Sequence, residues 1–183
     1  MSELIDRITK GNDKERADAW FHAGEIGAAA IRPLADTMGN ENLEVARAAK
    51  RGMWQVVRHA GRPGAGEEKR AVVAELVPLL GKDRPEPLRR EVLWMLSEIG
   101  GDESVDTVAA LLVDEKLRED ARCALERIPG DKSLEALQAA LAKAPDDFKG
   151  NLAQSIRARG VEVPGVPCRK MVPTKQTGVK PVG

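Results

Sequence analysis

A glycine closes each of five similar segments in this chain of 183 residues. The clearest segment, residues 88–100, reads LRREVLWMLSEIG and spaces its apolar residues along one face of a helix. The closing glycines recur at intervals of 34, 39, 30 and 30 residues and are Gly27, Gly61, Gly100, Gly130 and Gly160. A further amphipathic segment precedes each closing helix. Repeating units of this size with two helices each predict a solenoid, in which every pair buries its apolar face against its neighbours.

The fold class follows from the same pattern. No stretch alternates apolar and polar residues with the period of a strand, so we expect an all-α protein. The low aromatic content of 3% and the charged content of 32% suit a helical protein with much surface. We therefore predict a right-handed α-solenoid of about five helix pairs in residues 1–160. Residues 161–183 lose the helical periodicity and are predicted to form a basic C-terminal tail rich in proline and glycine.

Three second-helix segments carry a resemblance to a known family, residues 42–49 (NLEVARAA), residues 117–122 (LREDAR) and residues 88–100. They resemble the second helices of HEAT-like repeats, particularly the short repeats of phycobilisome-lyase-type proteins, whose typical sequence is an acid, Val-Arg, a run of alanines, then leucine and Ile-Gly. The resemblance covers about residues 12–160. The resemblance implies that the second helices line the concave side. It also implies a non-catalytic protein–protein interaction scaffold that binds its partner on this concave helical face.

Charge and targeting signals narrow the partner classes. The chain has 29 basic and 29 acidic residues, and the tail contains four basic residues and one acidic residue, so residues 1–160 carry a net charge of −3. Nucleic-acid binding is disfavoured because such proteins usually carry a basic excess. The first residues, MSELIDRITKG, are polar, and we expect no membrane segment. The expected partner is a protein or a peptide, bound by a monomer.

The cysteines and histidines predict neither a disulfide framework nor a metal site. Cys123 and Cys168 are the two cysteines, and we expect both to be reduced thiols in a cytoplasmic protein. His22 and His59 have no cysteine or histidine at ligand spacing. We therefore expect no metal, no cofactor and no catalytic residues.

Each tryptophan follows a basic residue by four positions, and these pairs form the candidate partner-binding site. The six residues are Arg16, Trp20, Lys50, Trp54, Arg90 and Trp94. Residues four apart are neighbours on a helix, so each cation is expected to lie over the indole that follows it. Indoles and cations in a row would provide flat apolar area beside charge for a partner. The alternative interpretation is that the indoles fill gaps between helices while the cations extend over them to solvent.

A ladder of basic residues occupies equivalent positions in the five units. It consists of Arg16, Lys50, Arg89, Arg118 and Lys149, and the acids at nearby turns are Asp13, Asp83, Asp114 and Asp147. One interpretation is a row of salt bridges between units that sets their register. The other is a row that binds anions.

Three further functions remain as alternatives. A bilin-lyase-like enzyme would hold a tetrapyrrole between tryptophan and arginine side chains. A DNA-glycosylase-like enzyme is suggested by a faint resemblance of Trp94 and Glu98 to the tryptophan and acid of HEAT-like alkylpurine glycosylases. The third alternative is simple nucleic-acid binding. The tail itself is another candidate occupant of the tryptophan row, through Val163, Val166, Met171 and Val172.

Overall fold

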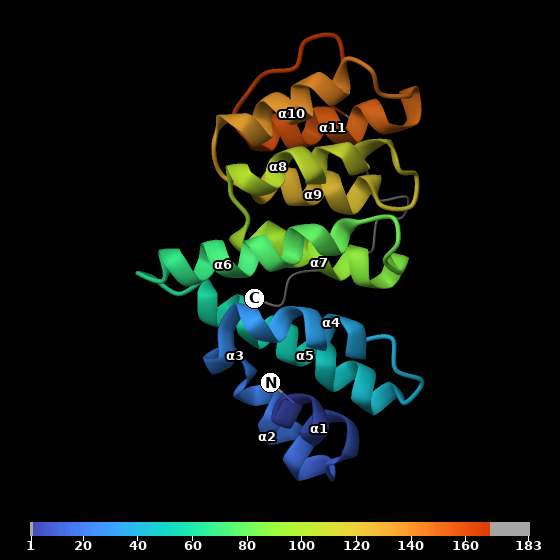
Figure 1. Ribbon diagram of the computed structural model, residues 1–183. Coiled ribbons are helices and arrows are strands. Elements are labelled where there is room, and N and C mark those ends of the chain that lie inside the picture. Colours follow the sequence, from blue (N-terminus) through green and yellow to red (C-terminus); the bar gives the residue numbers. More distant parts are fainter. Residues whose placement is uncertain (1, 169–183) are drawn as a thin grey trace, which may run out of the picture.

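A computed structural model describes residues 2–168 (Figure 1). Within this range the chain forms eleven α-helices, three short 3-10 helices and no strand, which confirms the all-α prediction. None of the helices in the same range has the length and apolar character needed to cross a membrane. The tail residues Met171 and Val172 lie outside the described range.

The helices form five consecutive pairs, as the closing glycines predicted. The first two pairs are α1 (Ser2–Lys10) with α2 (Asp13–Phe21) and α3 (Ala23–Ile26), then η1 (Gly27–Ala30) and α4 (Ile31–Thr37) with α5 (Leu43–Ala60). The other three are α6 (Gly66–Leu76) and η2 (Val77–Leu80) with α7 (Glu86–Ile99), α8 (Asp102–Ala109) and η3 (Ala110–Val113) with α9 (Arg118–Arg127), and α10 (Asp131–Leu141) with α11 (Asp146–Ala158).

The pairs stack into two layers (Figure 1). Each first helix contacts the first helix of an adjacent pair, as α4 does with α6 and α8 with α10. Each second helix contacts the next second helix, from α2 through α5, α7 and α9 to α11. We call the layer formed by α2, α3, α5, α7, α9 and α11 the second-helix layer. This arrangement is an α-solenoid.

One apolar core runs through all five pairs between the two layers. On α7, which packs against α9 and η2, Val92, Leu93 and Leu96 are completely buried. Burying a side chain of this size contributes about 1.5–3 kcal/mol to folding. Phe148 extends the core into the last pair, where it is 1% exposed. The core therefore couples each pair to the next one.

One helix departs from the sequence expectation, and the closing glycines differ from one another in conformation. The second helix of the first pair is interrupted at His22, which separates α2 from α3 before Gly27 is reached. The closing glycines also differ in conformation, because Gly130 has a φ of 100° that other residues rarely adopt, whereas Gly100 has a φ of −62°. At Gly100 the constraint is space, since an added Cβ would lie 2.5 Å from the carbonyl oxygen of Leu96.

Candidate functional site

The three tryptophans lie along the second-helix layer, on α2, α5 and α7. We call Trp20, Trp54 and Trp94 the indole row. Trp20 and Trp54 are half-buried against the core, and Trp94 is 41% exposed. Phe21, which sequence reasoning did not single out, is 60% exposed beside Trp20 at a ring-centroid distance of 6.0 Å. The layer thus presents aromatic area on several consecutive pairs.

Lys50 and Trp54 bind the same carboxylate across the junction between the second and third pairs. The Lys50 ammonium donates to Oε1 of Glu91 at 2.9 Å, and the Trp54 indole Nε1 donates to Oε2 at 3.1 Å. Glu91 lies on α7, so both side chains of α5 reach the next second helix. The carboxylate therefore neutralises the lysine and orients the indole at the same time.

The next junction repeats this arrangement with different residue types. Arg90 Nε donates to Oδ2 of Asp120 at 2.9 Å, and Trp94 Nε1 donates to Oδ1 at 3.0 Å. Asp120 on α9 holds the place in the fourth pair that Glu91 holds in the third. Its hydrogen bond to Arg90 raises the pKa of that guanidinium above its usual value. At both junctions a basic residue and the tryptophan four positions later bind one carboxylate of the following unit. We call this arrangement a clasp.

The cations over the indoles are not the predicted ones. Among the described residues, Arg51 lies over Trp20 at 5.5 Å and Arg58 lies over Trp54 at 5.8 Å. The expected stacking of Arg16, Lys50 and Arg90 is wrong because polar groups of the protein hold these cations elsewhere. Arg58 follows Trp54 by four positions, so its place was visible in the sequence. Arg51 reaches Trp20 from the neighbouring pair, which only the packing of α2 on α5 reveals.

Arg16 points into its own helix hairpin. Its Nε donates to the carbonyl oxygen of Ile8 at 2.9 Å, its Nη2 donates to the carbonyl oxygen of Gly11 at 3.0 Å, and its Nη1 pairs with Asp13 at 2.9 Å. Its side chain is 16% exposed. The structure therefore places Arg16 apart from the exposed part of the indole row.

The basic ladder pairs within the protein, partly between units and partly within them. Arg89 donates to the carbonyl oxygen of Leu80 at 3.1 Å and pairs with Asp114, and Arg118 pairs with Asp147 of the next unit. Lys149, by contrast, pairs with Asp146 of its own helix at 2.8 Å, just as Arg16 pairs with Asp13. Asp83 lies near Arg84 at 3.7 Å. The ladder is thus a mixed set of structural ion pairs.

A hollow of about 540 Å³ opens beside Trp54 on the second-helix layer. Trp54, Val57 and Ile99 provide its apolar wall, and Arg58 and Glu98 provide its charges. Glu98 pairs with Arg127 at 2.6 Å. The negative charge at this hollow is therefore compensated by a residue outside its lining.

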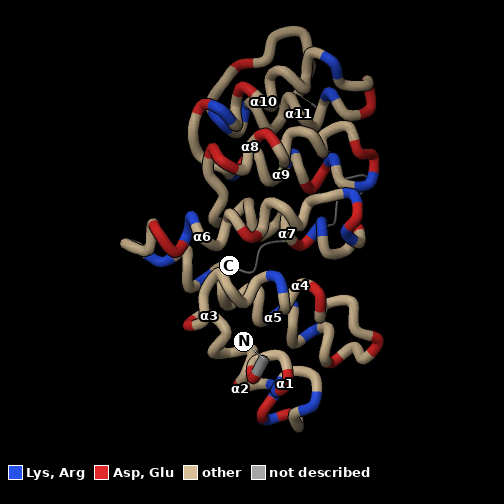
Figure 2. The backbone as a smooth tube through the Cα atoms, viewed as in Figure 1, with Lys and Arg blue, Asp and Glu red and all other residues tan. Residues whose placement is uncertain are grey.

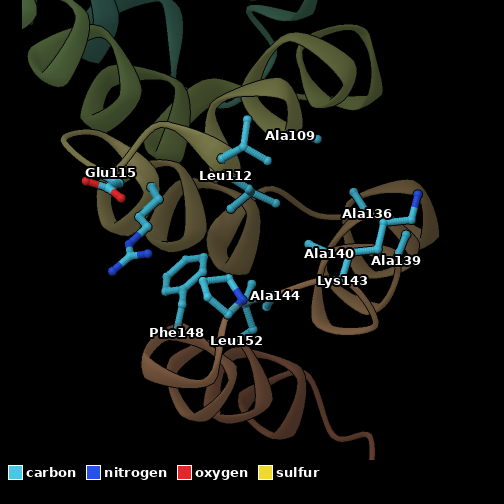
Figure 3. A pocket seen from close by; sticks show the side chains of 13 residues that line it. Ala109, Leu112, Glu115, Ala136, Ala139, Ala140, Lys143, Ala144, Phe148 and Leu152 are labelled. Carbon is cyan, nitrogen blue, oxygen red and sulfur yellow. The ribbon is translucent and has the colours of Figure 1, made fainter.

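A separate apolar pocket of about 400 Å³ lies between the last two pairs (Figure 3). Leu112, Phe148 and Leu152 line it together with a set of small residues on α10, and Figure 3 shows Phe148 facing across the pocket toward Leu112. Its volume is in the range of small-molecule sites. Sequence reasoning missed this pocket, because alanines on a helix signal neither a core nor a cavity.

Both cysteines are free thiols in different environments. Cys123 is half-buried and accepts a hydrogen bond of 3.1 Å from Arg122, and Cys168 is exposed. Burial raises the pKa of the Cys123 thiol, and the lowering effect of the neighbouring Arg122 does not cancel it. Within residues 2–168, no three His, Cys, Asp or Glu side chains are grouped so that they could hold a metal ion.

The stacked pairs and their intervening clasps define an α-solenoid repeat protein. A family model for HEAT repeats matches residues 73–157. The match spans slightly less than half of the chain and confirms the HEAT-like resemblance of its second helices over these residues. The narrower likeness to lyase-type repeats stays a prediction. No match was found among curated proteins.

Three solved structures resemble the chain at low identity. One engineered protein is 20% identical, with 85% of this chain and 77% of that chain covered at a TM-score of 0.43. A second engineered protein is 21% identical, with 87% and 47% covered at a TM-score of 0.43, so the chain spans about half of its length. A designed armadillo repeat protein is 14% identical, with 85% and 98% covered at a TM-score of 0.37.

Proposed function

We propose that the protein is a non-catalytic scaffold that binds a partner protein or peptide on the second-helix layer, the concave side of a HEAT-like stack. The observation that carries this proposal is the exposure of Trp94, which is 41% exposed in a row with two half-buried indoles. Tryptophans contribute large apolar area at low entropic cost and dominate the energetics of many interfaces. The indole row is therefore the binding surface we favour.

The charge distribution favours a protein partner over nucleic acid. Lys50 and Arg90, two cations of the predicted site, are neutralised by Glu91 and Asp120. Figure 2 shows basic and acidic residues interspersed along the stack. Phosphate backbones need several uncompensated cations along their path. The clasped cations instead support the indoles.

The enzyme alternatives receive less support from the geometry. A glycosylase-like reaction would need the Glu98 carboxylate, which is held by Arg127 at 2.6 Å. A bilin-lyase-like function is distinguished by experiment, because it would yield a coloured complex.

The proposal also includes the state of the protein. We propose a cytoplasmic monomer whose two thiols, Cys123 and Cys168, are reduced.

Affinity capture from a native lysate tests this function. The bait proteins are the wild type, Trp94→Ala, and Val113→Ala as a matched control that removes an exposed apolar side chain from the first-helix side. Circular dichroism verifies that each variant folds. We expect one protein to be captured by the wild type and by Val113→Ala and lost from Trp94→Ala. Capture of nucleic acid or pigment would favour an alternative, and identical captures by all three baits would refute the indole row as the binding surface.

A further inference from the structure

Among the described residues, two arginines of α5 have no acidic partner, unlike the other arginine and the lysine of the same helix. Arg51 and Arg58 are both exposed, and neither is within salt-bridge distance of an acid in the part of the chain that the structure describes. Their neighbours on the same helix are paired, Arg47 with Glu44 at 2.7 Å and Lys50 with Glu91 at 2.9 Å. The helix thus separates structural cations from two uncompensated ones.

Each of these two guanidinium groups lies over an indole. Arg51 lies 5.5 Å from the ring of Trp20, and Arg58 lies 5.8 Å from the ring of Trp54. Contact with the flat face of an aromatic ring restrains the arginine side chain while its N–H groups stay available in the guanidinium plane. The planar fork of donors matches a carboxylate in two-point geometry. Both arginine side chains are therefore restrained while their N–H donors remain free to bind an anionic group.

The spacing of the two arginines limits the shape of the anion. They are seven residues apart on one helix, which corresponds to about 10 Å along its axis. A peptide extended as a polyproline II helix advances about 3.1 Å per residue with three residues per turn, so residues three positions apart lie on one face. Two acidic residues at this spacing therefore span roughly the same distance, on the order of 9 Å.

The hollow beside Arg58 offers a place for an apolar side chain. Trp54, Val57 and Ile99 line it, and its volume is about 540 Å³. Because Arg127 compensates Glu98, the unbalanced charge at the hollow is that of Arg58. An apolar residue next to an acid would match both features at once.

We propose that α5 binds an acidic, extended segment of the partner protein, with one carboxylate on Arg51, another on Arg58, and an apolar side chain in the hollow beside Trp54. This inference rests on the proposed scaffold function and specifies its partner. A nucleic acid fits less well because only these two cations of the helix are uncompensated and residues 1–160 carry a net charge of −3.

A phage-displayed library of random peptides, selected on the full-length protein, tests the proposal. We expect enrichment of peptides with two acidic residues about three positions apart and an apolar residue near one of them. The selected peptides are then measured by fluorescence polarisation against the wild type and the double variant Arg51→Gln/Arg58→Gln. The loss expected is about tenfold or more in affinity, with steep salt dependence in the wild type.

Two comparison variants sharpen the measurement. Arg70→Gln removes an exposed arginine from α6 in the first-helix layer, and it is expected to leave the affinity unchanged. Arg51→Lys/Arg58→Lys keeps the charges but not the planar fork, so it is expected to recover only part of the affinity.

Each other outcome decides against the proposal in a different way. Neutral peptides that depend on Trp94 but not on the two arginines would overturn the acidic partner and leave the scaffold function standing. Peptides indifferent to both sets of residues, or the absence of any enriched peptide, would overturn both. Arginine-dependent binding of a labelled oligo-dT without acidic peptides would replace the inference with nucleic-acid binding.

Discussion

The indole of Trp94 donates a hydrogen bond of 3.0 Å to Asp120, across the junction between the third and fourth helix pairs. Trp54 makes the same kind of bond to Glu91 one junction earlier, at 3.1 Å. In both cases the basic residue four positions before the tryptophan binds the other oxygen of the carboxylate. The side chains of the candidate binding surface therefore also align consecutive units. Binding tests on these residues need a parallel measurement of stability.

Replacing Asp120 by alanine is expected to weaken the third junction. The change leaves the Arg90 guanidinium without its main partner and the Trp94 N–H without its acceptor. Hydrogen bonds to charged groups contribute more than neutral ones, but Arg90 is exposed to solvent, so we expect a small loss in the free energy of unfolding that still exceeds the effect of replacing an unpaired surface acid. Urea unfolding followed by circular dichroism measures it.

Glu135→Ala is the matched control for that experiment, because Glu135 is an exposed acid on α10. It is expected to change the free energy of unfolding by less than about 0.5 kcal/mol. Equal effects of the two substitutions would show that the clasp adds nothing to stability.

Two glycine-to-alanine changes are expected to act in opposite directions. At Gly24 on α3 an added Cβ would lie 2.9 Å from the carbonyl oxygen of Gln55 and 2.9 Å from the Cβ of His59, so α3 must move away from α5. The expected cost is about 1–3 kcal/mol. At Gly150 on α11 nothing lies within 4 Å of an added Cβ. There alanine is expected to stabilise by about 0.5–1 kcal/mol through helix propensity.

Chemical denaturation of both variants under identical conditions checks the sign. A lower free energy of unfolding for Gly150→Ala would contradict the prediction that helix propensity alone decides the effect at this position. An unaffected Gly24→Ala would mean that the contact between α3 and α5 is looser than described.

The thiol of Cys123 is expected to react with an alkylating reagent at higher pH than an unperturbed thiol does. Burial raises its pKa, so at a given pH below that pKa a smaller fraction is thiolate than in an unperturbed thiol, and only the thiolate reacts. The rate of reaction with iodoacetamide, measured over a pH series in the Cys168→Ser variant, should rise at higher pH than the rate of N-acetylcysteine amide. A rate profile at or below that of the reference compound would contradict the prediction.

Arg159 is expected to be intolerant of lysine. Its Nη1 donates to the carbonyl oxygens of Leu125 and Ile128 at 3.1 and 3.0 Å, and its Nη2 donates to the carbonyl oxygen of Gly130 at 2.8 Å. These groups lie at and after the C-terminal end of α9, where carbonyls lack helical partners. A lysine cannot reproduce the fork, so we expect a loss of about 1–2 kcal/mol.

Arg127→Lys provides the comparison, since Arg127 makes an exposed pair with Glu98 that lysine can also form. The two variants are compared by thermal unfolding. Indistinguishable midpoints would show that the Arg159 bonds do not differ from a surface ion pair in their contribution.

Sequence alone was sufficient for the architecture. Helical periodicity and the closing glycines predicted five helix pairs in an all-α solenoid, and the structure has them. This worked because the apolar stripe of a helix and its ends are set by residues close together in the chain. The position of the tryptophans on the second helices followed from the same local pattern.

The partners of those tryptophans were decided by tertiary structure. The sequence predicted that Lys50 and Arg90 would cover the indoles. Packing instead placed Glu91 within reach of Lys50 and Asp120 within reach of Arg90. It also brought Arg51 over Trp20 from a neighbouring helix. A contact between helices depends on their relative shift and rotation, which core packing sets across the whole stack. The row of indoles depends on local periodicity and was predicted from the sequence. Which cations remain uncompensated beside that row depends on contacts between helices, so only the structure showed it.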